Sequence, residues 1–488
     1  MKFASLKSAT SLAIILAAAP FLANCSKVES DKSEAVAAGG VCPEGFGWAE
    51  GLGGFQTANA KMDVNISATA DDCLFNQWSW ETFVWATAQP SGTPRFMGWK
   101  TAGDLLAPTA KAPRTGMLRL EGHMKPLHMP GRDGDSGSDE TLGGIVEADG
   151  SMLIGPNGYP VYASAHMTDG FFDTVKRNLI VTGAYQSNPN QDDYFSVGDA
   201  FVKATWYRLG DGEVAPKGAF TTKAEVPVLK QVCDATGCQA VTTGQFEVAT
   251  VALVGMHVVG LTNNHPEFIW ATFEHNMNAP AFADNSFEFD ASKSDPNTFT
   301  FYKGGTPFGE TTLLVNTNPS GGPVVTFDDA TGKFSPITQV VQMNKTGGDT
   351  QPNGPANITK LNTVSQAKLA QLNAKTPFQN YNLIGTTWFK PNTYVTTNPG
   401  WHNMGKKDAV GSISLMNSTA ETFIQSTKGK QGNNCFECHN ANSFSFPGVK
   451  PKALAARRVA ITHLVAMGSG YNGNNSLPVK GSAAPKAK

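Results

Sequence analysis

The sequence predicts a mainly β protein of the α+β class, in which antiparallel sheets form a large sandwich-like domain ahead of a helical C-terminal segment. Three observations support this fold class. The 488 residues include 50 Gly and 29 Pro, a composition that favours turns and short strands. Short runs of β-branched and aromatic residues recur between turn-forming residues, without the long intervening helices of parallel sheets. Hydrophobic residues make up 40% of the chain, enough to bury a large core.

The strands are expected where these apolar runs are most regular. The longest run lies at residues 248–261 and is almost wholly apolar, as in a strand that is covered on both faces. The expected strands, in chain order, are residues 117–120, 151–154, 159–162, 200–207, 248–261, 268–273, 299–302 and 312–315.

Helices are expected at fewer places. Residues 79–87 are rich in aromatic residues, and residues 358–373 carry apolar residues at helical spacing. Nearer the C-terminus, the same spacing recurs at residues 413–424 and again at residues 454–465. Residues 317–354 are polar and rich in turn formers, which predicts a large loop between strands and helices.

The first 24 residues have the pattern of an export signal. Lys2 and Lys7 precede an apolar run at residues 11–23, which is too short to span a bilayer of about 30 Å. Leu22-Ala-Asn-Cys25 resembles a bacterial lipoprotein box, in which Cys25 is acylated after cleavage, although Asn24 departs from the usual Gly, Ala or Ser. The alternative is an ordinary signal peptide of a soluble exported protein. We expect a lipoprotein in the periplasm, anchored in the outer membrane through Cys25 and in no other way.

The exported chain is expected to have four parts. Residues 25–40 are polar and rich in small residues, which is typical of a flexible tether. Residues 41–400 are expected to form the β-rich domain, residues 401–475 the helical segment, and residues 476–488 a disordered tail. The formal net charge is only -2, so the chain has no global basic field and no nucleic-acid partner is expected.

The cysteines of the β-rich domain predict two disulfides in an oxidising compartment. Cys233 and Cys238 flank a short turn-forming segment and favour a local bridge across a hairpin. That assignment leaves Cys42 to pair with Cys73, which would hold the N-terminal segment in place. Four cysteines allow three pairings, and the sequence by itself does not choose among them.

The most specific motif is Cys435-Phe-Glu-Cys438-His439. In C-x-x-C-H, two thiols about one helical turn apart can form thioethers to one haem, while the adjacent histidine coordinates its iron. Because the chain carries an export signal, we expect one covalent haem c on Cys435 and Cys438, with His439 as the proximal ligand. A disulfide or redox-active thiol pair and part of a zinc site are the alternatives, but no second CxxC or HxxxH supplies further zinc ligands.

The motif leaves the sixth iron ligand open. His257 is the first candidate, because an imidazole within an apolar strand must be either liganded or hydrogen-bonded; the alternative is a core histidine with satisfied hydrogen bonds. Glu274 and His275 are candidates for acid and base groups in a haem pocket, or for a structural ion pair. Other residues that can serve as iron ligands are His402, His463, Met256, Met404, Met416 and Met467.

Several short motifs resemble an uncharacterised family of large exported bacterial monohaem cytochrome c-like proteins. They lie at residues 80–83, 98–101, 202–206, 254–259, 268–275 and 415–421, the last followed by CxxCH. The similarity spans roughly residues 72–440. The resemblance implies export and covalent haem c, and it transfers no established reaction.

Two functions fit these features. The first is electron transfer in the cell envelope by a monohaem c-type cytochrome whose large domain docks a redox partner protein. The second is a haem-dependent oxidoreductase, peroxidase-like or oxygenase-like, in which the large domain forms a pocket for a small-molecule substrate. A fully ligated iron favours electron transfer, whereas an open position favours catalysis.

Overall fold

The computed structural model describes residues 42, 48–67, 70–106, 117–120, 127–128, 139–140, 152–178, 195–234, 237–281, 290–311, 325–349, 351–389, 409–425, 435–439 and 476–479. These residues belong to one compact unit, residues 35–488. Its strands are β1 (Lys100–Thr101), β2 (Leu118–Arg119), β3 (Leu127–His128), β4 (Asp139–Glu140), β5 (Val161–Met167), β6 (Ala200–Arg208), β7 (Thr221–Asp234), β8 (Gly237–Thr262), β9 (His265–His275), β10 (Thr326–Asp328), β11 (Lys333–Ser335), β12 (Tyr381–Phe389), β13 (Ala409–Gly411) and β14 (Ser476–Val479).

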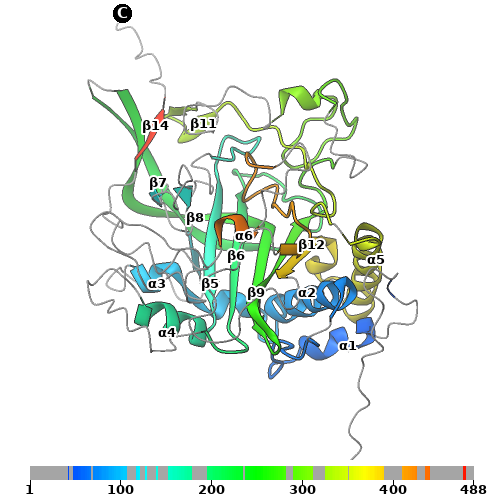
Figure 1. Ribbon diagram of the computed structural model, residues 1–488. Helices are drawn as coiled ribbons and strands as arrows, with labels where there is room; N and C mark the ends of the chain where they lie inside the picture. Colours follow the sequence, from blue (N-terminus) through cyan, green and yellow to red (C-terminus); the bar gives the residue numbers. More distant parts are fainter. Residues whose placement is uncertain are drawn as a thin grey trace, which may run out of the picture. The chain divides into compact units, whose positions relative to one another are not determined.

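Ten of these strands form one sheet (Figure 1). Its main path is β1-β5-β6-β8-β9-β12-β13; β7 and β14 also pair with β8, and β2 pairs with β7. Among the described ladders of this sheet, all but the short β2–β7 pair are antiparallel. The mainly β fold class predicted from the sequence is therefore confirmed.

The described helices are α-helices and 3-10 helices of 3 to 19 residues. The α-helices are α1 (Trp48–Phe55), α2 (Asp72–Thr87), α3 (Ala102–Leu106), α4 (Asp169–Asn178), α5 (Gly354–Leu372) and α6 (Cys435–Cys438), and the 3-10 helices are η1 (Arg95–Gly98), η3 (Phe308–Glu310) and η4 (Pro377–Asn380). The helices predicted at residues 79–87 and 358–373 correspond to α2 and α5.

Strand β8 lies in the interior of the sheet and contributes to the hydrophobic core. Residues 251–262 of β8 are all buried, and β6 and β9 pair with it on either side. A continuous apolar run suits this position because both faces of the strand are covered. The strands predicted at residues 200–207, 248–261 and 268–273 lie within β6, β8 and β9.

Helices α1, α2 and α5 cover one face of the sheet, called here the helical face; α2 and α5 contact β12, and α1 contacts both helices. Phe83 of α2 stacks on Phe273 of β9, with ring centroids 4.1 Å apart. Trp80 Nε1 donates to Asn362 Oδ1 of α5 at 3.1 Å, so even the indole N–H in this layer is paired. The N-terminus of α2 is capped by Asp71, which accepts from the backbone N of Leu74.

The other face of the sheet is covered by residues 412–425, called here the covering segment, which follow β13 without forming a regular helix. Apart from the large sheet, the described strands form only two two-stranded ribbons, β3–β4 and β10–β11. The large sheet is thus covered by helices and an irregular segment, and the sandwich-like stacking expected from the sequence is not seen in the described residues.

The covering segment corrects the helix predicted at residues 413–424. The apolar residues there recur at helical spacing, but backbone N–H groups of polar residues between them donate to carboxylates and not to helical carbonyls. The backbone N of Ser418 donates to Glu274 Oε1 of β9 at 2.6 Å, and that of Asn417 donates to Glu421 Oε2 at 2.9 Å. Side chains that compete for backbone groups in this way prevent a regular helix.

Three other predicted elements differ from the structure. Residues 299–302 form a turn closed by a single bridge between Phe299 and Tyr302. Of the run predicted at 151–154, residues 152–154 are described, and among these only Ile154 makes a bridge, to Pro160. The loop predicted at residues 317–354 contains the β10–β11 hairpin. The strand predicted at 312–315 and the helix predicted at 454–465 lie outside the described residues.

A long hairpin of β7 and β8 extends the sheet (Figure 1). Its strand β8 also pairs with β14, from Ser476 opposite Val241 to Val479 opposite Cys238. Residues 476–479 were expected to begin a disordered tail, so this part of the expectation is wrong. The edge of β8 offers unpaired backbone groups there, and adding a strand satisfies them.

The disulfide predicted between Cys42 and Cys73 is confirmed. It ties residue 42 to the first turn of α2, and the backbone N of Cys42 also donates to Asn357 Oδ1 of α5 at 2.9 Å. Cys233 is disulfide-bonded and lies directly opposite Cys238 in the β7–β8 ladder, the register that the predicted hairpin bridge requires. Among the described residues, no helix is long and apolar enough to cross a membrane.

Candidate haem-binding site

The CxxCH motif forms a single helical turn, α6, followed by His439. The backbone N of His439 donates to the carbonyl O of Cys435 at 2.7 Å, which closes this turn. Cys435 begins this turn and Cys438 ends it, so the two residues lie about one helical turn apart along the backbone. The helical setting of the motif was expected from the sequence.

The motif packs on the sheet through aromatic rings. The His439 imidazole lies over the Trp270 ring of β9, with centroids 4.4 Å apart and planes inclined by 30°. Phe436 has no exposed surface and stacks on Phe389 of β12 at 4.1 Å. Its edge also meets Trp270, 6.4 Å between centroids. The sequence identified the motif but gave no signal for this docking position.

Trp270 has an unused hydrogen-bonding group. Its side chain is only 7% exposed, and its Nε1 is buried with no hydrogen-bond partner among the residues that the structure describes. A buried indole N–H normally finds an acceptor. Trp270, which contacts the CxxCH motif through His439, therefore carries a donor that suits an anionic or carbonyl oxygen.

The alternation of β9 explains why Trp270 faces the motif. Phe273 points to the helical face, where it stacks on Phe83. Successive side chains of a strand point to opposite faces, so Trp270, Thr272 and Glu274 point to the covered face that carries residues 412–425. This face is where the structure brings the candidate site together.

His257 of β8 lies on the same covered face. It is directly opposite Thr272 in the β8–β9 ladder, and it is thus a diagonal neighbour of Trp270, a relation that places Cα atoms about 7–8 Å apart. His257 Nδ1 lies 2.7 Å from Thr272 Oγ1, and its Nε2 lies 3.0 and 3.1 Å from the two oxygens of Glu421. Both ring nitrogens are engaged, as expected of a hydrogen-bonded core histidine.

Glu421 is the charged residue that joins the covering segment to the sheet. Lys203 of β6 lies beside His257 in the sheet, and its Nζ is 3.6 Å from Glu421 Oε1. Burial raises the pKa of Glu421, but the charge and hydrogen bond of His257, and then the charge of Lys203, outweigh it and lower the pKa to about 2. Glu421 is therefore ionised at neutral pH. Both residues lie in motifs that carry the family resemblance, at 202–206 and 415–421, but neither was assigned a role in the site from the sequence.

Glu274 is a second buried carboxyl on this face. Its Oε1 accepts from the backbone N of Ser418 at 2.6 Å, and its Oε2 accepts a short hydrogen bond from Ser418 Oγ. Burial raises the pKa of Glu274 to about 7, against the hydrogen bonds of Ser418. The carboxyl thus anchors the covering segment and is close to its titration point at neutral pH.

His275, the other predicted acid or base candidate, is not near Glu274. Consecutive strand residues point to opposite faces. The His275 ring packs edge-on against Tyr381 at 5.3 Å, and its Nδ1 accepts from the backbone N of Met277. Burial lowers its pKa to about 4, so it is neutral at pH 7. The structure does not bring Glu274 and His275 together as a catalytic or ion pair.

A glycine of β8 makes room for the covering segment. A Cβ at Gly255 would collide with Thr419 Oγ1 and come within 2.7 Å of Asn417 Oδ1. Thr419 Oγ1 also lies 2.7 Å from Thr205 Oγ1 of β6. The close approach of the segment therefore depends on the absence of a side chain at Gly255. The density of Ser, Thr and Asn at residues 412–419 is the only sequence signal of this role.

The remaining predicted ligands divide into two groups. Met256 lies opposite Phe273 in the ladder and shares its face, so it points away from Trp270. Met416 is buried in the covering segment. His402, Met404, His463, Met467 and the predicted acylation site Cys25 lie outside the described residues.

No family model, curated protein or solved structure matches this chain. The resemblance to large exported monohaem cytochrome c-like proteins therefore stays a prediction, and the function rests on the residues of the site.

Proposed function

We propose that this protein is an exported monohaem c-type cytochrome that transfers electrons in the cell envelope. Cys435 and Cys438 would hold haem c through thioethers, and His439 would bind its iron. The observation that carries the proposal is the docking of the CxxCH turn on the sheet, with His439 over Trp270 and Phe436 buried. When bound, the haem supplies a single-electron Fe(II)/Fe(III) couple.

The residues around the motif suit such a group. The helical turn runs from Cys435 to Cys438, and Phe436 anchors this turn in the core beside Phe389. The buried N–H of Trp270 can donate to a carboxylate, such as a haem propionate. The Trp270 ring covers one face of the His439 imidazole, which is half-buried.

The polar residues on the covered face favour electron transfer over haem catalysis. A distal acid or base needs a nitrogen or oxygen that is free to exchange a proton with substrate. Both ring nitrogens of His257 contact protein groups, and Glu274 is held by Ser418. These residues therefore support the covering segment, which leads along the chain to the CxxCH motif.

Haem attachment is tested in the full chain produced together with a c-type cytochrome maturation system. We expect haem staining that survives denaturing electrophoresis and a reduced pyridine adduct with a c-type band. Cys435→Ser with Cys438→Ser should abolish both signals. The matched control, Cys233→Ser with Cys238→Ser, changes another cysteine pair and should keep them. Signals that persist without Cys435 and Cys438 would refute the attachment site.

The electron-transfer role is tested by ligand binding and redox titration of the haem-loaded protein. We expect a reversible one-electron couple and little carbon monoxide binding by the ferrous form, because electron transfer favours a fully ligated iron. Rapid carbon monoxide binding together with peroxide turnover would support the haem-dependent oxidoreductase instead.

The proposed location is the periplasm, with the protein tethered to the outer membrane through lipid on Cys25. Labelled palmitate should be incorporated into the wild type and be lost from Cys25→Ala. An unlabelled wild type in the soluble fraction would instead indicate ordinary signal cleavage. The partner is then a redox protein of the same compartment.

A further inference from the structure

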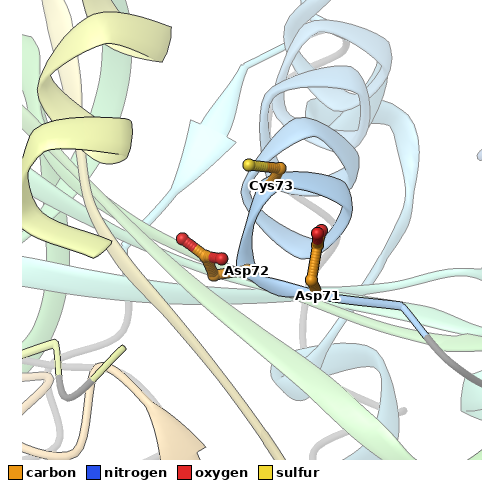
Figure 2. A group of neighbouring side chains, drawn as sticks. All are labelled: Asp71, Asp72 and Cys73. Carbon is orange, nitrogen blue, oxygen red and sulfur yellow. The ribbon is translucent and has the colours of Figure 1, made fainter. Parts of the chain in front are cut away.

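The first turn of α2 contains a group of metal-ligating residue types away from the haem motif. Asp71, Asp72 and Cys73 each present a ligand-type atom within 4.8 Å of the other two (Figure 2). The sulfur of Cys73 is in the disulfide with Cys42, and Asp71 is the N-cap of the helix. Figure 2 shows the two carboxylates on different sides of the turn. Asp72 is the more deeply buried of the two acids, whereas Asp71 caps the helix through Oδ1 and keeps its Oδ2 unpaired among the described residues.

Asp72 lies between α2 and α5 with 1% of its surface exposed. Its Oδ2 accepts from Asn357 Nδ2 of α5 at 2.7 Å, whereas its Oδ1 is buried without a hydrogen-bond partner among the described residues. A buried carboxylate oxygen that lacks a partner is costly. An ion, a proton or a water molecule at Asp72 Oδ1 would remove this cost.

Asn76 adds a second and independent observation. Its side chain has no exposed surface, and neither Oδ1 nor Nδ2 has a hydrogen-bond partner in the described part of the chain. It lies one helical turn after Asp72, so both side chains share one face of α2. Ser79, on the same face, contacts Thr386 Oγ1 of β12 at 2.7 Å, which directs this face toward β12.

Asp349, in the loop before α5, packs on the first turn of that helix, one turn before Asn357, which donates to Asp72. Its Oδ1 lies so close to Gly354 of α5 that a Cβ there would collide with it. Its Oδ2 is 3.4 Å from Ser412 Oγ, and the backbone N of Ser412 donates to the carbonyl of Thr386. Thr386 thus contacts both Ser79 of α2 and Ser412, the residue that contacts Asp349.

The charge of Asp72 acts on the Asp349 carboxyl. Burial raises the pKa of Asp349 to about 7, and the charge of Asp72 adds to this effect. Burial also raises the pKa of Asp72. No basic side chain is among the groups that shift either pKa.

We propose that Asp72, Asn76 and Asp349 bind a divalent cation, for which Ca²⁺ is the best match. Ca²⁺ takes six to eight oxygen ligands in irregular geometry, including carboxylates, amide carbonyls and backbone carbonyls. The Ser412 hydroxyl and the Thr346 carbonyl, 3.2 Å apart, offer further oxygens. The ion would join α2, the start of the covering segment and the loop before α5, a role that is independent of haem.

The test uses the full-length chain after chelator treatment. We expect equilibrium dialysis with ⁴⁵Ca²⁺ to find about one bound ion, and millimolar Ca²⁺ to raise the melting temperature by a few degrees. Asp72→Asn keeps the shape of the side chain and should weaken Ca²⁺ binding by roughly tenfold or more. Asp349→Asn should do the same, and it is the decisive variant if Asp72→Asn does not fold.

The matched control is Asp71→Asn, which removes a charge from the same turn and keeps a good N-cap residue. It should leave Ca²⁺ binding nearly unchanged, because Asp71 points away from the proposed site. Two results would overturn the proposal: no bound ion and no thermal shift in the wild type, or equal Ca²⁺ affinity in the wild type and in Asp349→Asn. The first would mean that protons or water satisfy the carboxyls, and the second that Ca²⁺ binds elsewhere.

Discussion

Replacing Glu421 by glutamine tests how the covering segment is held on the sheet. The carboxylate contacts His257 Nε2 at 3.0 and 3.1 Å, accepts from the backbone N of Asn417 at 2.9 Å, and lies 3.6 Å from Lys203 Nζ. Glutamine has the same shape but no charge. Lys203, which is largely buried, would then lose its counter-charge, and His257 Nε2 would lose its carboxylate partner.

The size of the effect follows from the pKa of Glu421, which lies at about 2 against an ordinary value of 4.5. A shift of this size corresponds to about 3 kcal/mol in favour of the ionised folded state. Leaving a buried partner charge unpaired costs a similar amount, about 3–5 kcal/mol. We therefore expect Glu421→Gln to lower the free energy of unfolding by about 3 kcal/mol at pH 7.

The pH dependence identifies the cause of this loss. Because the pKa of Glu421 is lower in the folded state, its contribution is present above about pH 4.5 and is lost as the pH falls toward 2. Urea unfolding between pH 2 and pH 7 should show this loss in the wild type, and a smaller one in Glu421→Gln. Glu310→Gln, at an exposed position, is the control. Equal stability and equal pH profiles of Glu421→Gln and wild type would refute the role of the charge.

Four further predictions concern the site and its support. His257→Ala should lower the free energy of unfolding by about 1–3 kcal/mol and leave the Soret band of the haem-loaded protein unchanged; a shifted band would instead make His257 an iron ligand. Because the pKa of Glu274 is raised in the folded state, the free energy of unfolding of the wild type should fall by about 3 kcal/mol as the pH rises from 4.5 to beyond 7. Urea unfolding of Glu274→Gln should not show this fall. Trp270→Leu should reduce the yield of attached haem and cost about 2–4 kcal/mol, measured by haem absorbance and urea unfolding; full yield and stability would exclude Trp270 as the docking surface. Cys42→Ser with Cys73→Ser should cost about 3 kcal/mol in urea, and unchanged stability would contradict an anchoring role for this disulfide.

The regular part of the fold could be predicted because the local composition and spacing of its residues match the positions that they occupy. Residues 248–261 are almost wholly apolar, and a strand of this composition is typical of a position that is covered on both faces. Aromatic residues at 79–87 and apolar spacing at 358–373 likewise specify α2 and α5. β12 was not predicted, although it pairs with β9. Its position next to β9 depends on the packing of distant segments, which local composition does not encode.

The candidate site was predicted only in part, for a related reason. The CxxCH motif is recognisable because the chemistry of haem attachment requires that local spacing. Its docking partner Trp270 and the anchor Glu421 depend on contacts between residues far apart in the chain. The apolar residues at 413–424 recur at helical spacing, but they do not form a regular helix. Polar residues of this segment form hydrogen bonds to the sheet instead. Glu274 was identified, but its pairing with His275 fails because adjacent strand residues point to opposite faces.

The register of β9 links the hydrophobic core to the proposed haem site. Phe273 stacks on Phe83 at 4.1 Å on the helical face, and Trp270 meets His439 at 4.4 Å on the other. A slip of one residue would turn Phe273 toward the polar covering segment and Trp270 toward the helices. It would also turn Glu274 away from Ser418 and bury its carboxyl against α2, at a cost of several kcal/mol. The packing that stabilises the core therefore also selects the face on which the CxxCH motif can dock.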